Sequence, residues 1–153
     1  VMKISTNISY KEATRSNTAS RLNMPNNPTE EVREVMVNTA FNVFEPLRKW
    51  VGGPVKVNSF FRSVPLNKAI GGSDNSQHCK GQAMDIDDTF GFKTNAEMFY
   101  HIVSELEFDQ VIWEFGDDEN PEWVHVSYVS PEVNRKRALR AIRVNGRTQY
   151  VTL

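Results

Sequence analysis

The stretch SQHCKGQAMDID, residues 76–87, combines a histidine, His78, with an aspartate, Asp85, seven positions later. Gly81 lies between them and gives the backbone freedom to turn, so that both side chains could converge on one ion. The last six residues alternate and predict a strand, which places Asp85 on the face opposite Met84. The stretch alone leaves two interpretations open, a polar surface turn or two ligands of a metal ion.

The sequence EWVH, residues 122–125, offers the remaining parts of such a site. A catalytic zinc takes three protein ligands and keeps one position for water, whose pKa it lowers toward about 7. His125 would be the third ligand, and Glu122 would take the proton of the attacking water and return it to the leaving amine. Positions three apart on a regular strand point to opposite faces, so Glu122 reaches the site only if the chain bends there. Each residue also has an ordinary structural interpretation, and the spacing alone does not decide between the two.

The surrounding periodicity predicts an α+β fold. Thr29 is the predicted N-cap of an amphipathic helix of about 20 residues, which Pro46 should kink, and Thr94 opens a second helix through a capping box. The predicted strands are 55–60, 82–87, 110–115 and 122–129, followed by a C-terminal hairpin at 139–153 built on an Asn-Gly turn. Because short turns join the strands, we expect helices packed on a small antiparallel sheet. One domain should span 1–153, with a polar N-terminal segment at 1–28.

The composition is that of a globular protein, with 39% apolar and 24% charged residues among 153. The net charge of −1 gives no overall field that would draw the protein to nucleic acid or membrane. No apolar run approaches the roughly 18 residues of a membrane helix, and the N-terminus lacks the apolar core of a signal peptide. We expect a monomer that is synthesised in the cytoplasm and has no nucleic-acid or membrane partner. Its single cysteine excludes an internal disulfide.

Charge is nevertheless segregated along the chain. Residues 105–122 contain eight acidic residues and no basic ones, whereas 135–147 contain six basic residues and no acidic ones. Two solvated faces that partly neutralise each other would explain this pattern. The alternative is that the basic segment docks on an anionic polymer, such as a cell-wall polymer.

Three segments, in the same order, resemble the motifs of one family. SQHCKGQAMDI is similar to the SxHxxGxAxD motif of the zinc D-Ala-D-Ala carboxypeptidases and dipeptidases, relatives of lysostaphin-type peptidases and of the hedgehog domain. EWVHVS resembles the second motif of this family, in which a glutamate precedes the third zinc ligand by three residues. SFFRSVPLNKAIGGSDNSQH resembles its SGYRSxxLNxxxGG segment, so the resemblance runs over residues 59–127.

The resemblance implies a hedgehog-like or D-Ala-D-Ala peptidase-like fold and a role for each site residue. One catalytic Zn²⁺ would be bound by His78, Asp85 and His125. Glu122 would be the general base and acid, Arg62 would stabilise the oxyanion, and Ser76 would hydrogen-bond to the substrate. Without the motif, Arg62 would be interpreted as a surface ion-pair partner and Ser76 as a loop-capping hydroxyl.

The implied function is a zinc metallopeptidase that hydrolyses the stem peptides of peptidoglycan, as a D-Ala-D-Ala carboxypeptidase or an L-Ala-D-Glu endopeptidase. A phage endolysin, a virion-associated peptidase and a bacterial cytoplasmic enzyme all fit this description. A second hypothesis keeps the fold and the zinc in a binding or phage structural protein that does not cut, against which the presence of Glu122 argues. A third is a purely structural zinc, whose chelation would unfold the protein.

Overall fold

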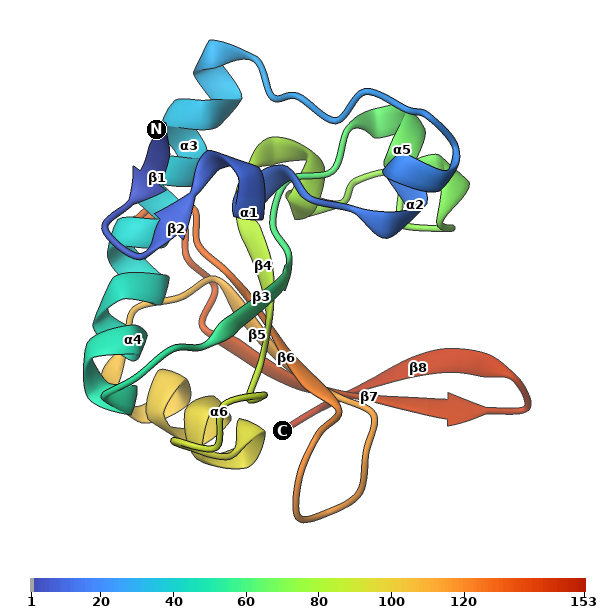
Figure 1. Cartoon of the computed structure of the whole chain (residues 1–153). Helices are drawn as coiled ribbons and strands as arrows, with labels where there is room; N and C mark the ends of the chain where they lie inside the picture. Colours follow the sequence, from blue (N-terminus) through green and yellow to red (C-terminus); the bar gives the residue numbers. More distant parts are fainter. Residues whose placement is uncertain (1) are drawn as a thin grey trace.

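A sheet of six strands forms the centre of the fold (Figure 1) in the computed structural model, which describes residues 2–153. The strands lie side by side in the order β3-β4-β6-β5-β7-β8. Their bounds are β3 (Lys56–Ser59), β4 (Ala83–Asp87), β5 (Gln110–Glu114), β6 (Trp123–Ser127), β7 (Arg137–Val144) and β8 (Arg147–Thr152). Helices and a separate pair of short strands accompany this sheet, so the predicted α+β class is confirmed.

The sheet is mixed, because β5 and β7 pair in parallel while the other neighbours are antiparallel. We expected antiparallel pairing throughout, and the difference has a topological cause. β6 ends with Ser127 opposite Gln110, and after the loop 128–136, β7 begins with Arg137 opposite the same Gln110. Since β7 starts at the edge where β6 ends, it runs in the direction of β5.

The long helix predicted from Thr29 forms in three parts. They are α3 (Glu30–Thr39), a π-helical turn η1 (Ala40–Phe44) and α4 (Glu45–Val51). Thr29 Oγ1 accepts a hydrogen bond from the Val32 amide at 3.2 Å, as expected of an N-cap. Pro46 lies in the first turn of α4, where its missing N–H costs little, and the wider η1 turn interrupts the regular helix directly before it.

The second predicted helix is α6 (Asn95–Glu105). Its capping box is present, because the Thr94 hydroxyl accepts from the Glu97 amide and the Glu97 carboxylate accepts from the Thr94 amide, both at 3.0 Å. Two shorter elements, α5 (Val64–Ala69) and the 3₁₀ turn η2 (Gln77–Lys80), lie between β3 and β4. No helix within residues 2–153 has both the length and the apolar character needed to cross a membrane.

The polar segment before Thr29 also folds onto the domain. It contains β1 (Lys3–Ser5), β2 (Ile8–Ser9), α1 (Tyr10–Thr14) and α2 (Asn17–Arg21). Ile4 and Ile8 are buried in the main core. Glu45 of α4 accepts a hydrogen bond from the Ser5 hydroxyl at 2.6 Å and so ties this segment to the helix.

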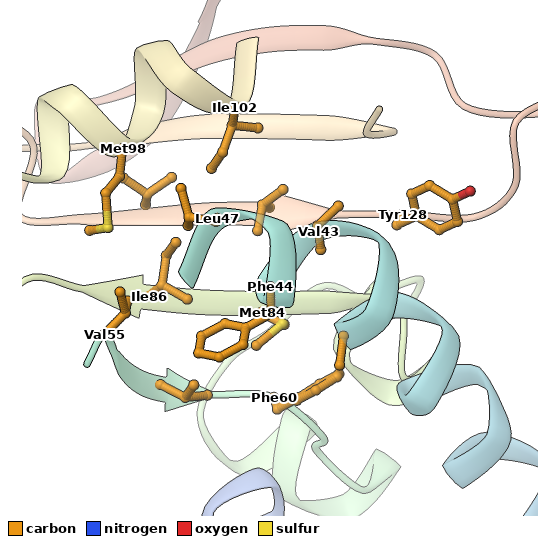
Figure 2. Packing of buried hydrophobic residues seen from close by; sticks show 14 of the residues in the cluster. Val43, Phe44, Leu47, Val55, Phe60, Met84, Ile86, Met98, Ile102 and Tyr128 are labelled. Carbon is orange, nitrogen blue, oxygen red and sulfur yellow. The ribbon is translucent and has the colours of Figure 1, made fainter. Parts of the chain in front are cut away.

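One face of the sheet carries the core, as Figure 2 shows. Side chains of η1 and α4 meet those of β4 and α6 there. The packed members include Val43, Phe44, Leu47, Met84, Ile86, Met98 and Ile102. The helices α4 and α6 lie together on one side of the sheet, whereas the hairpin of β7 and β8 projects away from them (Figure 1). Because strand residues alternate between faces, every second residue of β4, β5 and β6 is left for the opposite face.

Candidate metal centre and cleft

Three side chains that are far apart in the sequence converge on the sheet face opposite the core. They are His78, Asp85 and His125, and one ligand atom of each lies within 4.8 Å of the others. His125 Nδ1 is 2.9 Å from Asp85 Oδ1, and His78 Nε2 is 3.3 Å from Asp85 Oδ2. The structure therefore brings together the three residues that the sequence motifs suggest as metal ligands.

The pairing of β4 with β6 fixes the direction in which Asp85 and His125 point. Asp85 of β4 lies directly opposite His125 of β6, and residues directly opposite in an antiparallel pair point to the same face. The neighbouring pair, Met84 and Val126, points to the other face and is buried in the core. A shift of one residue in this register would exchange the two faces, so the core and the site depend on the same pairing.

The third donor, His78, reaches the site from η2. Ser76 Oγ accepts a hydrogen bond from the His78 amide at 3.2 Å and caps this turn. The turn ends at Gly81, whose φ of +75° is in the left-handed region that favours glycine. A Cβ at this position would lie 2.7 Å from Met36 Cγ and 2.9 Å from the Val32 carbonyl oxygen. Gly81 is thus needed both for the turn and for the close approach of α3.

A hydrogen bond sets the tautomer of His78. Its Nδ1 lies 2.8 Å from the Phe60 carbonyl oxygen, which can only accept, so Nδ1 carries the hydrogen. Burial lowers the pKa of His78, an effect that the charge of Asp85 opposes, and a neutral ring leaves Nε2 without a hydrogen. Among the described residues nothing donates to this buried nitrogen. Its lone pair instead faces a carboxylate oxygen, an arrangement that a cation between them would stabilise.

The carboxylate of Asp85 is held in its charged form. Burial would raise its pKa, but the hydrogen bond with His125 Nδ1 at 2.9 Å and the positive charge that the two neighbouring imidazoles can carry outweigh this and hold the pKa well below its usual range. A permanent carboxylate beside two imidazoles is the donor set that zinc takes in catalytic sites. The residues present therefore fit a single divalent metal ion.

Arg62 and Ser76 lie beside this cluster. Both line the same cleft as the three donors. The Arg62 side chain is half-buried, its Nε is buried without a hydrogen-bond partner among residues 2–153, and burial lowers its pKa while Asp85 opposes the shift. The Ser76 hydroxyl accepts from the His78 amide, which leaves its own hydrogen free to donate.

The cleft has a volume of about 1080 Å³, at the upper end of ligand sites in proteins. Its floor is the sheet face that carries Asp85 and His125, and one wall comes from the hairpin of β7 and β8. The hairpin residues that line it are Arg137, Leu139, Arg143, Thr148 and Tyr150. The cleft is therefore completed by a segment that follows all the metal donors in the sequence.

Glu122 occupies a different place from the one that the motif implies. It precedes β6, its side chain is exposed, and it lines a separate hollow of about 300 Å³ with Gly116 and Arg140. Its backbone amide donates to the carbonyl of Glu114 at 2.9 Å. Glu122 does not line the cleft that contains the cluster.

Glu114 does line that cleft, although the sequence motifs do not indicate it. It is the last residue of β5 and is only 7% exposed. Burial raises the pKa of its carboxyl to about 7, an effect that His125 opposes and Asp85 reinforces. An acidic residue inside the apolar run QVIWEF is the one sequence signal that could have drawn attention to it.

An ion pair between the buried Asp109 and the exposed Arg135 lies where η2 meets the sheet. Asp109 accepts hydrogen bonds from Arg135 Nη2 at 2.7 Å and from Gln77 Nε2 at 3.0 Å, directly before His78. Burial would raise the pKa of Asp109, but the hydrogen bonds from Arg135 and Gln77 outweigh this and lower it to about 2. The ordinary value is 3.8, so the charged form is the one that the folded protein stabilises.

We expect Asp109→Asn to lower the free energy of unfolding by about 2 kcal/mol at pH 7. Because the folded pKa lies below the unfolded one, this contribution is fully present above about pH 4 and is lost as the pH falls toward 2. Urea unfolding between pH 7 and 3 should show the wild-type and variant curves converging at the acidic end. Asp118→Asn, which breaks the exposed pair with Arg140, is the control and should cost less than about 1 kcal/mol. Equal costs for the two variants would contradict the role given to Asp109.

Two imidazoles and one carboxylate, two of them from the sheet and one from η2, meet at a single point in the cleft and form the donor set of a mononuclear metal hydrolase. The chain matches the family model described as peptidase M15 over residues 6–127, and it belongs to that family. It is therefore a metallopeptidase, which confirms the resemblance to the zinc D-Ala-D-Ala carboxypeptidases. The match ends with β6, so β7 and β8 lie outside it. The search of curated proteins found no match.

Proposed function

We propose that this protein is a zinc-dependent peptidase that hydrolyses the stem peptides of peptidoglycan. Its membership of the peptidase M15 family supports peptidoglycan as the general target. The observation that carries the zinc proposal is the buried, unpartnered Nε2 of His78, which faces Asp85 in the cluster completed by His125. These three residues would hold the ion. When bound, zinc would supply a Lewis acid for the scissile carbonyl and lower the pKa of water.

The other residues of the cleft act on the substrate. Arg62 would donate hydrogen bonds to the carbonyl oxygen as negative charge develops on it, and its half-buried position would strengthen this interaction. Ser76 would donate its free hydroxyl hydrogen to a backbone carbonyl of the bound peptide. A carboxylate must also take a proton from the attacking water, and Glu122 and Glu114 are the two candidates.

The test of the function is the release of new amino groups from purified peptidoglycan. We expect release that stops when zinc is chelated and returns when zinc is added back, with the protein folded throughout. No release by the zinc-saturated protein would overturn the proposal. Mass spectrometry of the products of defined muropeptides would then separate a D-Ala-D-Ala carboxypeptidase from an L-Ala-D-Glu endopeptidase. Lysis of intact bacterial walls would test the further proposal that the enzyme is a phage endolysin.

We infer that the basic segment contributes to substrate binding. Arg137 and Arg143 lie on the β7 wall of the cleft, both exposed, and Arg143 stacks on the ring of Phe115 at 4.0 Å. Stem peptides carry free carboxylates, which such cations attract. The position of these two arginines supports the hypothesis that the basic segment 135–147 docks on an anionic partner. It argues against the alternative that this segment only forms a solvated face.

Replacing both arginines by glutamine should raise KM by up to about tenfold and leave kcat nearly unchanged, since exposed ion pairs contribute about 1 kcal/mol or less each. KM of the wild type should also rise with salt, and that of the double variant should rise less. Arg147→Gln is the matched control, because Arg147 is exposed on the same hairpin but does not line the cleft. An unchanged KM and salt dependence in the double variant would contradict this role.

A further inference from the structure

The hairpin wall of the cleft carries an aromatic residue, Tyr150, that the sequence motifs do not indicate. Tyr150 belongs to β8 and lines the same cleft as the metal donors. The family match ends at residue 127, so it implies no role for this residue. A tyrosine on the wall of a cleft can either cover the sheet beneath it or bind the ligand, and its position relative to the metal donors decides between the two.

The strand register places Tyr150 on the face of the metal donors. Glu114 of β5 pairs with Ala141 of β7, and Ala141 pairs with Tyr150 of β8. Ile112, two residues before Glu114 on the same strand, lies directly opposite His125. Paired residues and residues two apart on a strand share a face, so all of these side chains point into the cleft. Two strand spacings, or about 10 Å, separate the backbones of Glu114 and Tyr150.

A small residue fills the position between them. Ala141 is fully buried and packs with Ile112 and Leu139 in a separate apolar cluster on this face of the sheet. Its side chain ends at Cβ, so it leaves the space above the sheet open. The long side chain of Tyr150 can therefore extend over Ala141 toward the metal donors. A larger residue at position 141 would fill that space.

The hydroxyl of Tyr150 is a free, neutral hydrogen-bond donor. Burial raises the pKa of the phenol above its ordinary value of 10, and the nearby carboxyl groups of Glu114 and Asp85 raise it further. The phenol therefore keeps its hydrogen at neutral pH. No hydrogen bond from residues 2–153 contributes to this shift, so the hydroxyl is available to a ligand in the cleft.

Tyr150 also lies on the side of the cleft opposite Arg62. Arg62 follows β3, which is one edge of the six-stranded sheet, and Tyr150 is on β8, the other edge. The strands that carry Asp85 and His125 lie between these edges. A peptide bound over the metal donors would therefore meet a cationic donor on one side and a neutral donor on the other.

We infer that Tyr150 is a substrate-binding residue whose hydroxyl donates a hydrogen bond to a carbonyl oxygen of the peptide in the cleft. The inference rests on the proposed function and extends it to a part of the chain outside the family match. The hairpin would then bind the substrate in two ways, by the charge of its arginines and by a neutral hydrogen bond. Such a bond is made to the intact peptide, so its loss should appear in KM and not in kcat.

The first experiment measures the kinetics of Tyr150→Phe, which removes the hydroxyl and keeps the ring. KM of the zinc-loaded protein should rise about 3- to 10-fold, the usual loss for one hydrogen bond, with kcat changed less than about twofold. Salt should change KM of the variant and of the wild type by the same factor, because a neutral bond is not screened. Tyr100→Phe is the matched control, since Tyr100 is 60% exposed against 57% for Tyr150 and does not line the cleft. A wild-type KM in Tyr150→Phe would overturn the inference.

A second measurement separates binding from catalysis and from folding. Calorimetry with a synthetic stem peptide and the zinc-free protein, which is not expected to cleave, should give a Kd about 3- to 10-fold higher for Tyr150→Phe than for the wild type. The urea midpoint of unfolding should stay unchanged. Weaker binding together with a lower midpoint would overturn the inference, because Tyr150 would then only support the hairpin. Wild-type protein that binds the peptide through Tyr150 but cleaves nothing when loaded with zinc would refute the proposed function instead.

Discussion

Asp85→Asn should abolish peptidase activity and weaken zinc binding more than 100-fold. Changes to groups that only orient metal ligands already cost about 10- to 100-fold in affinity, and Asp85 is the one anionic donor of the cluster. Asparagine keeps the shape of the side chain but lacks the charge that holds two imidazoles together around a cation. Without the ion, several kcal/mol of transition-state stabilisation are lost, and about 4 kcal/mol corresponds to roughly 1000-fold in rate.

Zinc affinity is measured by chelator competition and activity by amino-group release. Asp74→Asn is the matched control, because Asp74 is an exposed loop carboxylate that does not line the cleft. We expect this variant to behave as the wild type in both assays. Wild-type zinc affinity in Asp85→Asn would show that the ion, if any, is bound elsewhere and would remove the basis of the proposed function.

Gly81→Ala should lower the free energy of unfolding of the metal-free protein by about 2 to 4 kcal/mol. Alanine at φ +75° is strained, and its Cβ would also lie 2.9 Å from the backbone oxygen of Val32, which cannot move without shifting α3. The same displacement would move η2 and with it His78. We therefore expect weaker zinc binding in addition to the loss of stability.

The variant Gly52→Ala separates the effect of backbone strain at positive φ from the effect of the clash with α3. Gly52 has a similar φ of +80°, but a Cβ there would meet nothing within 4 Å. This variant should lose only about 1 kcal/mol, the cost of the backbone conformation alone, and bind zinc normally. Urea unfolding of both variants gives the comparison. Equal losses would mean that the approach of α3 to Gly81 has no energetic importance.

Local sequence signals predicted the helices after Thr29 and Thr94, the strands of the sheet and the candidate metal ligands. Thr29 and Thr94 cap the helices that begin after them, because a hydroxyl three residues from an amide can form that bond before any tertiary contact exists. The turn at Asn145 and Gly146 has positive φ at both residues, as an Asn-Gly hairpin requires. The candidate metal ligands could also be recognised from local sequence, because each of them lies in a short motif whose residue types and spacing can be read along the chain.

Only the tertiary structure decided which acidic side chain shares the cleft with those donors. Glu122 is three residues from His125 and Glu114 is eleven residues away, yet Glu114 lines the cleft and Glu122 does not. The face to which a strand residue points is set by the register of its neighbours, here Ile112 opposite His125. The parallel pairing of β5 with β7, which brings the basic hairpin to the cleft, also depends on where β6 ends. Pairing between distant segments is not a local property, so no periodicity within one segment could determine it.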